Sequence, residues 1–150
     1  MTAMTPKANA HLFVRRALLA DAAASAATGS LLAIGADLLN DWLGLPVLLM
    51  RYAGLSLLPF AAIVLFVGLR QAPPRAAVLA IIAYNVLWAL DSFVLLASGW
   101  VAPTLLGSAF VVMQAVTVGL LAVLQWIGVK RAAADTERSR NTPPLTVEYH

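Results

Sequence analysis

Residues 92–129 read SFVLLASGWVAPTLLGSAFVVMQAVTVGLLAVLQWIGV, and no charged side chain occurs between Asp91 and Lys130. As one straight helix these 38 residues would measure about 57 Å, nearly twice the roughly 30 Å hydrocarbon core of a bilayer. The segment must therefore turn, and Ser98-Gly99-Trp100-Val101-Ala102-Pro103 supplies the break. The stretch predicts two membrane-spanning helices, over 76–98 and 104–128.

Two more apolar segments, 16–39 and 47–69, precede this pair and carry few charges. Each exceeds the ~20 residues that a transmembrane helix needs, and neither shows the alternation of a barrel strand. We therefore expect an all-α integral membrane protein whose four transmembrane helices form an up-down antiparallel bundle with short connections. Residues 1–14 and 130–150 are expected to be tails, the second of them disordered.

The composition excludes several classes of protein. Hydrophobic residues make up 61% of the chain and charged residues 11%, against roughly 45–50% and 25% in soluble domains. With no cysteine there is no disulfide or thiolate site, and the two histidines, His11 and His150, lie outside the apolar segments. No catalytic motif is present. We expect no enzyme activity, no cofactor, no metal and no nucleic-acid partner.

The basic residues predict the orientation. Nine of the ten basic residues flank the apolar segments on one side of the predicted bundle, and only Arg51 lies on the other side. These nine are Lys7, Arg15, Arg16, Arg70, Arg75, Lys130, Arg131, Arg138 and Arg140. Because lysine and arginine accumulate on the cytoplasmic side, both termini should be cytoplasmic. The compact, alanine- and leucine-rich chain favours a multi-pass protein of a bacterial inner (plasma) membrane.

A weak internal repeat superposes Pro46 on Pro103, with apolar helices on either side. It would consist of two helical hairpins related by an axis along the membrane normal. Convergence between two short apolar hairpins explains the pattern equally well, so the sequence leaves duplication open.

Small residues mark two helix-packing surfaces. Ser25, Gly29 and Ala33 recur every fourth residue in the first segment, and Ala115 and Gly119 form a shorter line in the last. Such lines let another helix backbone approach closely. The partner is either a helix of the same chain or a second membrane chain.

A candidate polar site lies on the third and fourth segments. Tyr84 and Asp91 are seven residues apart and share one helix face, and Asn85 borders it. Unpaired polar groups in hydrocarbon cost several kcal/mol, so this face should look into the bundle or at a partner. Gln114, near the middle of the last segment, is the expected hydrogen-bonding partner from the neighbouring helix.

Asp91 is the acid that the sequence singles out, about 10 Å inside the outer end of its predicted helix. Asp37, Asp41 and Arg51 form an outer charge cluster around it, with three carboxylates for one arginine. Either Asp91 binds a proton or a cation, or Asp91 or Asp37 pairs with Arg51 and fixes the helix arrangement. Asp21 is expected near the inner interface, where basic residues would neutralise it.

Two functions follow from these patterns. The first is a small non-enzymatic membrane protein that works by helix–helix association, as a homo-oligomer or as an accessory subunit of a membrane complex. The second is a small proton- or cation-coupled transporter or channel that uses Asp91.

Overall fold

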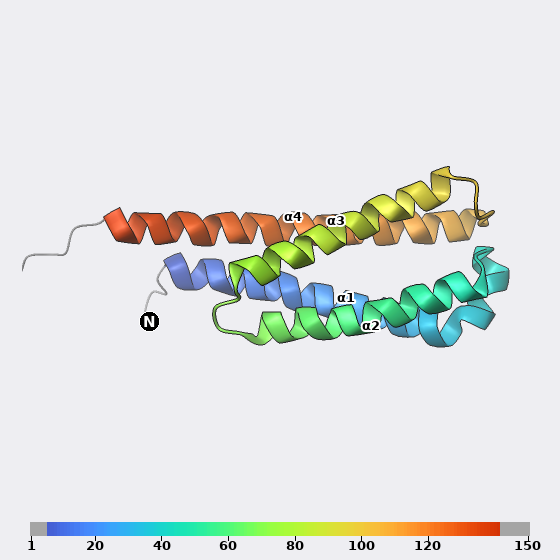
Figure 1. Cartoon of the computed structure of the whole chain (residues 1–150), viewed down its shortest axis with the longest axis horizontal. Coiled ribbons are helices and arrows are strands. Elements are labelled where there is room, and N and C mark those ends of the chain that lie inside the picture. Colours follow the sequence, from blue (N-terminus) through green and yellow to red (C-terminus); the bar gives the residue numbers. More distant parts are fainter. Residues whose placement is uncertain (1–5, 142–150) are drawn as a thin grey trace, which may run out of the picture.

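The computed structural model describes residues 6–141, which form four helices. They are α1 (Pro6–Leu43), α2 (Val47–Leu69), α3 (Arg75–Ala97) and α4 (Leu105–Asn141), and the described part of the chain contains no strand (Figure 1). Each helix contains a segment long and apolar enough to cross a membrane. The prediction of an all-α protein with four long apolar helices is confirmed.

Two helices are longer than the apolar segments that predicted them. The α2 helix matches its predicted range, but α1 has 38 residues and α4 has 37. Helix therefore occupies 6–14 and 130–141, within the segments expected to be tails, and the rest of those segments lies outside the described residues. The cause is the local sequence, because alanine, arginine and lysine are strong helix formers. The extensions also meet, with the Arg131 guanidinium 5.4 Å from the ring centre of Phe13.

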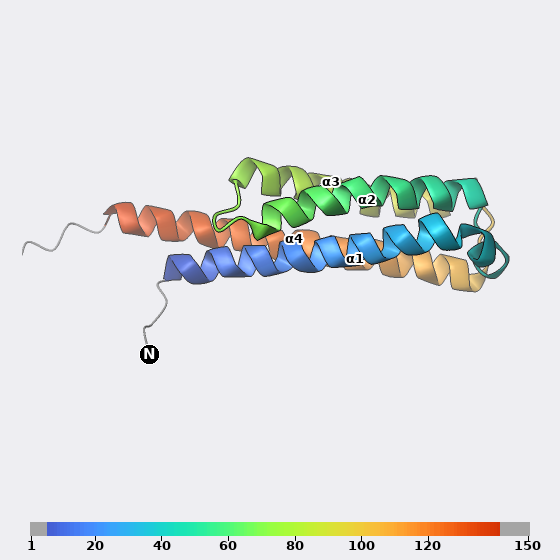
Figure 2. The same cartoon turned by 90° about the horizontal axis from the view of Figure 1, so that it is seen from below.

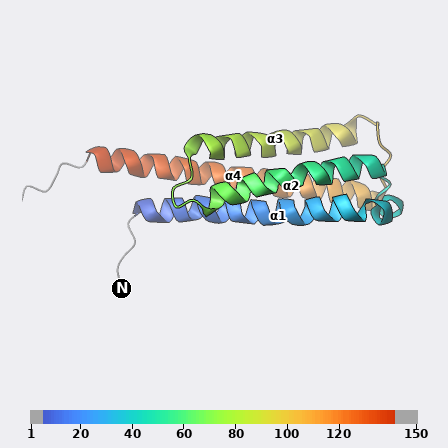
Figure 3. The ribbon, with the colours of Figure 1, turned by 60° about the horizontal axis from the view of Figure 1, so that its bottom comes forward.

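The helices pack in the spatial order α2, α1, α4, α3. The α1 helix packs along both α2 and α4, and α4 packs along α3 (Figures 2 and 3). The α2 and α3 backbones come close at few points and meet mainly through side chains, as where the Phe60 ring stacks on Tyr84. We call this boundary the α2/α3 seam. Connections 44–46 and 98–104 share one end of the bundle, here the connection end; connection 70–74 lies toward the other, the terminal end, where α1 begins and α4 finishes (Figure 1).

Glycine explains why α1 and α2 pack so closely. A Cβ atom built on Gly54 of α2 would lie 2.5 Å from the Ala33 nitrogen and 2.6 Å from the Gly29 oxygen of α1. No residue with a side chain fits there without separating the two backbones. The predicted line of small residues on α1 thus meets a helix of its own chain at Gly29 and Ala33.

A second glycine ends α1 and lets the two hairpins meet. Gly44 has a φ of +64°, a left-handed conformation that other residues rarely adopt, and its N–H donates to the Asn40 carbonyl at 2.8 Å. The adjoining Leu43 carbonyl accepts the Thr104 N–H at 2.9 Å. A backbone hydrogen bond between the end of α1 and the residue before α4 therefore joins the two hairpins at the connection end.

Large apolar side chains cover much of the outside. Ile34, Leu38 and Leu105 are 83%, 81% and 89% exposed. Inside, one apolar cluster lies toward the terminal end around Leu18 and Val64, and another toward the connection end around Met50. An exterior this apolar matches a membrane-associated protein better than one bathed in water.

Candidate functional site

A carboxylate is buried among three helices of the bundle. Asp21 of α1 is 0% exposed. Its Oδ2 atom accepts hydrogen bonds from Asn85 Nδ2 of α3 at 2.6 Å and from Gln125 Nε2 of α4 at 2.7 Å. Its Oδ1 atom accepts a third from the Ser25 hydroxyl at 3.2 Å. We call these four residues the Asp21 cluster.

The donors in the Asp21 cluster are all uncharged and almost completely buried. Asn85 is 1% exposed, Gln125 0% and Ser25 6%. Asn85 lies about halfway along α3, so the cluster occupies the middle of the bundle. Burying a carboxylate costs several kcal/mol unless hydrogen bonds or charges compensate. Here two amides and a hydroxyl provide that compensation.

The amide of Gln125 allows the cluster to accommodate a proton as well. Its Nε2 atom donates to Asp21, while its Oε1 atom is buried without a hydrogen-bond partner among the described residues. A half-turn of the amide would exchange these atoms, so that Oε1 could accept from the O–H of a protonated Asp21. The cluster can therefore satisfy both the charged and the neutral carboxyl group.

The structure places Asp21 differently from the sequence expectation. Asp21 does not approach the basic residues of the inner interface, and the Arg15 Nε atom donates instead to the Gly68 carbonyl at 3.2 Å. The expectation was wrong because α1 packs against α3 and α4 with Asp21 at the depth of Asn85 and Gln125. Sequence reasoning also missed Gln125. The available signal was its position, since Leu121, Ala122 and Val129 on the same face are all buried.

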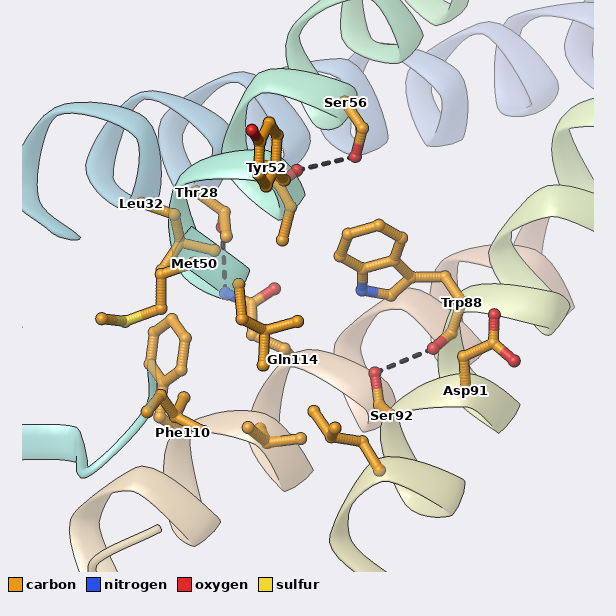
Figure 4. A pocket seen from close by; sticks show the side chains of 15 residues that line it. Thr28, Leu32, Met50, Tyr52, Ser56, Trp88, Asp91, Ser92, Phe110 and Gln114 are labelled. Atoms are coloured by element: carbon orange, nitrogen blue, oxygen red, sulfur yellow. Dashed lines mark hydrogen bonds between the residues drawn. The ribbon is translucent and has the colours of Figure 1, made fainter. Parts of the chain in front are cut away.

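A cavity of about 440 Å³ lies between the helices on the connection-end side of the Asp21 cluster (Figure 4). Its lining is mostly apolar. The residues that line it are Thr28, Leu32, Leu45, Leu49, Met50, Tyr52, Ala53, Ser56, Trp88, Asp91, Ser92, Leu95, Phe110, Val111 and Gln114. Gln114 Nε2 donates to the Thr28 hydroxyl at 2.9 Å (Figure 4). This pair joins α1 to α4 at the wall of the cavity.

The four residues of the predicted polar site separate into three environments. Asn85 belongs to the Asp21 cluster, and the Tyr84 ring stacks on Phe60 with ring centres 4.2 Å apart. Asp91 and Gln114 line the same cavity, but Asp91 is exposed. Neighbours on a helix point about 100° apart, which explains why Tyr84 and Asn85 face different partners.

The outer charge cluster contains one ion pair. Arg51 donates to Asp37, and their side chains are 40% and 69% exposed. Asp41 is exposed on the same end of α1. The ion pair thus lies at the bundle surface and does not include Asp91.

The predicted packing residues of α4 differ from each other. Ala115 is 2% exposed, whereas a Cβ atom on Gly119 would meet nothing within 4 Å. Ala115 therefore lies inside this chain, and the surface at Gly119 has room for another group.

No family model, curated protein or solved structure matches the chain. Within residues 6–141, no group of three or more His, Asp or Glu side chains is arranged to hold a metal ion. The Asp21 cluster and the cavity are thus the features from which a function can be argued.

Proposed function

We propose that this protein is a small proton-coupled membrane transporter in which Asp21, and not Asp91, binds and releases the proton. The observation that supports it best is the burial of Asp21 at the centre of the bundle with only uncharged donors around it. Ionisable residues inside a membrane bundle are rare and costly, and they commonly mark proton or ion pathways. Three different helices hold the carboxyl group, so a change in its charge acts on how those helices pack.

The cavity is the proposed solute site. Its volume of about 440 Å³ falls in the range of roughly 300–1,000 Å³ typical of small-molecule sites. The mostly apolar walls favour a small, largely apolar solute. The α1, α3 and α4 helices supply both the cavity wall and the Asp21 cluster, which gives the proton and the solute common elements through which to influence each other.

We further propose an up-down antiparallel arrangement in a bacterial inner membrane, with both termini cytoplasmic. The clustering of basic residues in the segments at the terminal end supports this orientation. The cavity would then open in the outer half of the membrane. If the repeat is real, its units would be the α1–α2 and α3–α4 hairpins.

The test is proton binding by the protein in liposomes, measured by infrared difference spectroscopy between acidic and alkaline buffers. Wild type and the control variant Asp41→Asn should show the carbonyl band of a protonated buried carboxyl group, and Asp21→Asn should lack it. With a pH-sensitive dye inside the liposomes, small apolar solutes that drive proton movement in wild type should do nothing in Asp21→Asn. An unchanged band in Asp21→Asn, or its loss in Asp91→Asn alone, would overturn the proposal.

Helix–helix association remains the second proposal, and the outer face of α3 favours it. Only Val78, Ile81 and Asn85 of this helix are buried. Asp91, at the edge of the cavity, is also exposed, and an acid at this depth is costly unless water, a proton or a partner chain meets it. A second copy of the chain, or a larger membrane complex, would cover this face. Cross-linking in native membranes through a cysteine at Leu87, also exposed on α3, tests this proposal.

A further inference from the structure

Two hydroxyl groups, those of Ser25 and Thr28, lie along α1 between the Asp21 carboxyl group and the cavity. Asp21, Ser25 and Thr28 are spaced four and three residues apart on α1, so they lie on one face of the helix. Ser25 is hydrogen-bonded to Asp21, and Thr28 lines the cavity. Side chains three residues apart have Cβ atoms about 5–6 Å apart, a gap that one water molecule can bridge.

The polarity of these hydrogen bonds runs in one direction. The Ser25 hydroxyl donates its single proton to Asp21 Oδ1, so its lone pairs remain free to accept a hydrogen bond. Thr28 Oγ1 accepts from Gln114 Nε2, so its own proton remains free to be donated. Gln114 therefore acts as a positioning residue that leaves the Thr28 proton available toward Ser25. Every donor in the line can point from the cavity toward Asp21.

Apolar side chains block the opposite direction. Leu18, Val78 and Ile81 lie one or two turns from Asp21 and Asn85 toward the terminal end, and each is at most 4% exposed. Together with Val129 of α4, which is also buried, they belong to one apolar cluster. A second hollow of about 380 Å³ lies beyond them, and Val78 and Val129 form part of its wall. The described conformation thus separates that hollow from Asp21 by packed hydrocarbon.

We propose that Asp21 exchanges its proton with the cavity alone in this conformation, through the hydroxyl groups of Thr28 and Ser25. A proton from cavity water binds Thr28 Oγ1 as the Thr28 proton passes through a bridging water to Ser25. The Ser25 proton passes in turn to Asp21 Oδ1, so that one proton enters and one carboxylate becomes a carboxylic acid. This inference rests on the proposed function, because it assumes that Asp21 is the proton acceptor.

The rate of proton uptake after a pH jump tests the hydroxyl line. In liposomes, Thr28→Val should slow protonation of the buried carboxyl group at least tenfold without changing its final extent, and Thr28→Ser should restore the rate. Ser25→Ala should slow protonation by a similar factor, and it should also raise the final extent because the carboxylate loses a hydrogen bond. Thr117→Val is the matched control, because the Thr117 hydroxyl is exposed and donates to the Met113 carbonyl of its own helix. Circular dichroism establishes that each variant is folded. Wild-type rates in both Thr28→Val and Ser25→Ala would overturn the inference.

Single cysteines test the direction of access, and the chain lends itself to this because it has none of its own. A membrane-impermeant thiol reagent should modify Thr28→Cys from the cavity side at least tenfold faster than it modifies Leu18→Cys from either side, because Leu18 is fully buried and lines neither hollow. Equal rates, or a Thr28→Cys variant that never reacts, would overturn the inference. The proposed function and the proposed path fail in different ways. If Asp21→Asn still takes up the proton, the proposed function is refuted. If Asp21→Asn loses proton uptake but Thr28→Val and Ser25→Ala keep the wild-type rate, only the path through the hydroxyl groups is refuted.

Discussion

Replacing Asp21 by leucine, its closest apolar match in shape, should destabilise the bundle. The variant leaves the Asn85 and Gln125 amides, 1% and 0% exposed, without their acceptor. A buried unsatisfied donor costs about 1–3 kcal/mol, and hydrogen bonds between membrane helices average about 0.6 kcal/mol. Two orphaned amides would cost about 2–6 kcal/mol at that rate, and the weakness of membrane hydrogen bonds puts the expected loss in the free energy of unfolding at the lower end, about 2–4 kcal/mol.

Removing the carboxyl group and both amides should reverse most of that loss. In the triple variant Asp21→Leu, Asn85→Leu and Gln125→Met, Ser25 is the remaining member of the cluster, and its hydroxyl can donate to a carbonyl of its own helix instead. The replacements keep the number of non-hydrogen side-chain atoms nearly constant. Volume-conserving apolar replacements commonly cost less than about 1.5 kcal/mol, and replacing a buried polar network is often neutral or stabilising. We expect the triple variant to be more stable than Asp21→Leu and close to wild type, although it should bind no proton at this site.

The assay is reversible unfolding in mixed micelles of a mild detergent and dodecyl sulfate, followed by circular dichroism. The helices stay in the micelle in both states, so the cost of transferring a carboxylate out of water largely cancels. Asp41→Leu, at an exposed position, should change stability by less than about 0.5 kcal/mol. A single variant as stable as wild type, or a triple variant no better than Asp21→Leu, would refute the reasoning that these hydrogen bonds hold the helices together.

Three further variants test the fold by the same unfolding assay. Gly54→Ala should lose at least about 1–3 kcal/mol through overpacking against α1, whereas Gly119→Ala, with open space around it, should be neutral or gain up to about 1 kcal/mol; equal effects would contradict the packing of α1 on α2. Gly44→Ala should cost about 1–2 kcal/mol, because alanine must adopt a φ of +64°. Arg51→Leu should cost less than about 1 kcal/mol, since its pair with Asp37 is partly exposed, and a larger loss would show that the pair matters more than its exposure implies.

The number and kind of helices could be predicted from sequence because the apolar runs are long and the breaks between them contain proline or glycine. The ends of α1 and α4 could not, since a charged residue ends an apolar run without ending a helix. Arg15 and Lys130 lie inside their helices. The length of an apolar segment and the length of the helix that contains it are thus different quantities, and hydropathy predicts only the first.

The candidate site was predicted in part, and the reason lies in relative helix depth. The sequence identifies Asn85 and Gln114 as inward-facing polar groups, and the structure shows both hydrogen-bonded to α1. The expected pairing of Gln114 with the polar face of α3 is wrong, because Gln114 donates to Thr28 instead. Asp21 was placed at the interface because its depth was counted from Arg16, although packing against α3 and α4 determines it. Gln125 has no charge and no motif, so only the position of its neighbours in space reveals its role.

The α2/α3 seam has a consequence for how the bilayer acts on this protein. Toward the terminal end the Phe60–Tyr84 stack joins α2 to α3, but toward the connection end the cavity lies between the two helices and both of them line it. In the proposed membrane setting, the lateral pressure of the lipid chains opposes expansion of the cavity, so the volume open to the proposed solute depends on chain length and unsaturation as well as on the protein. Occupancy of the cavity should then vary with the membrane in which the chain resides, even when every side chain is unchanged.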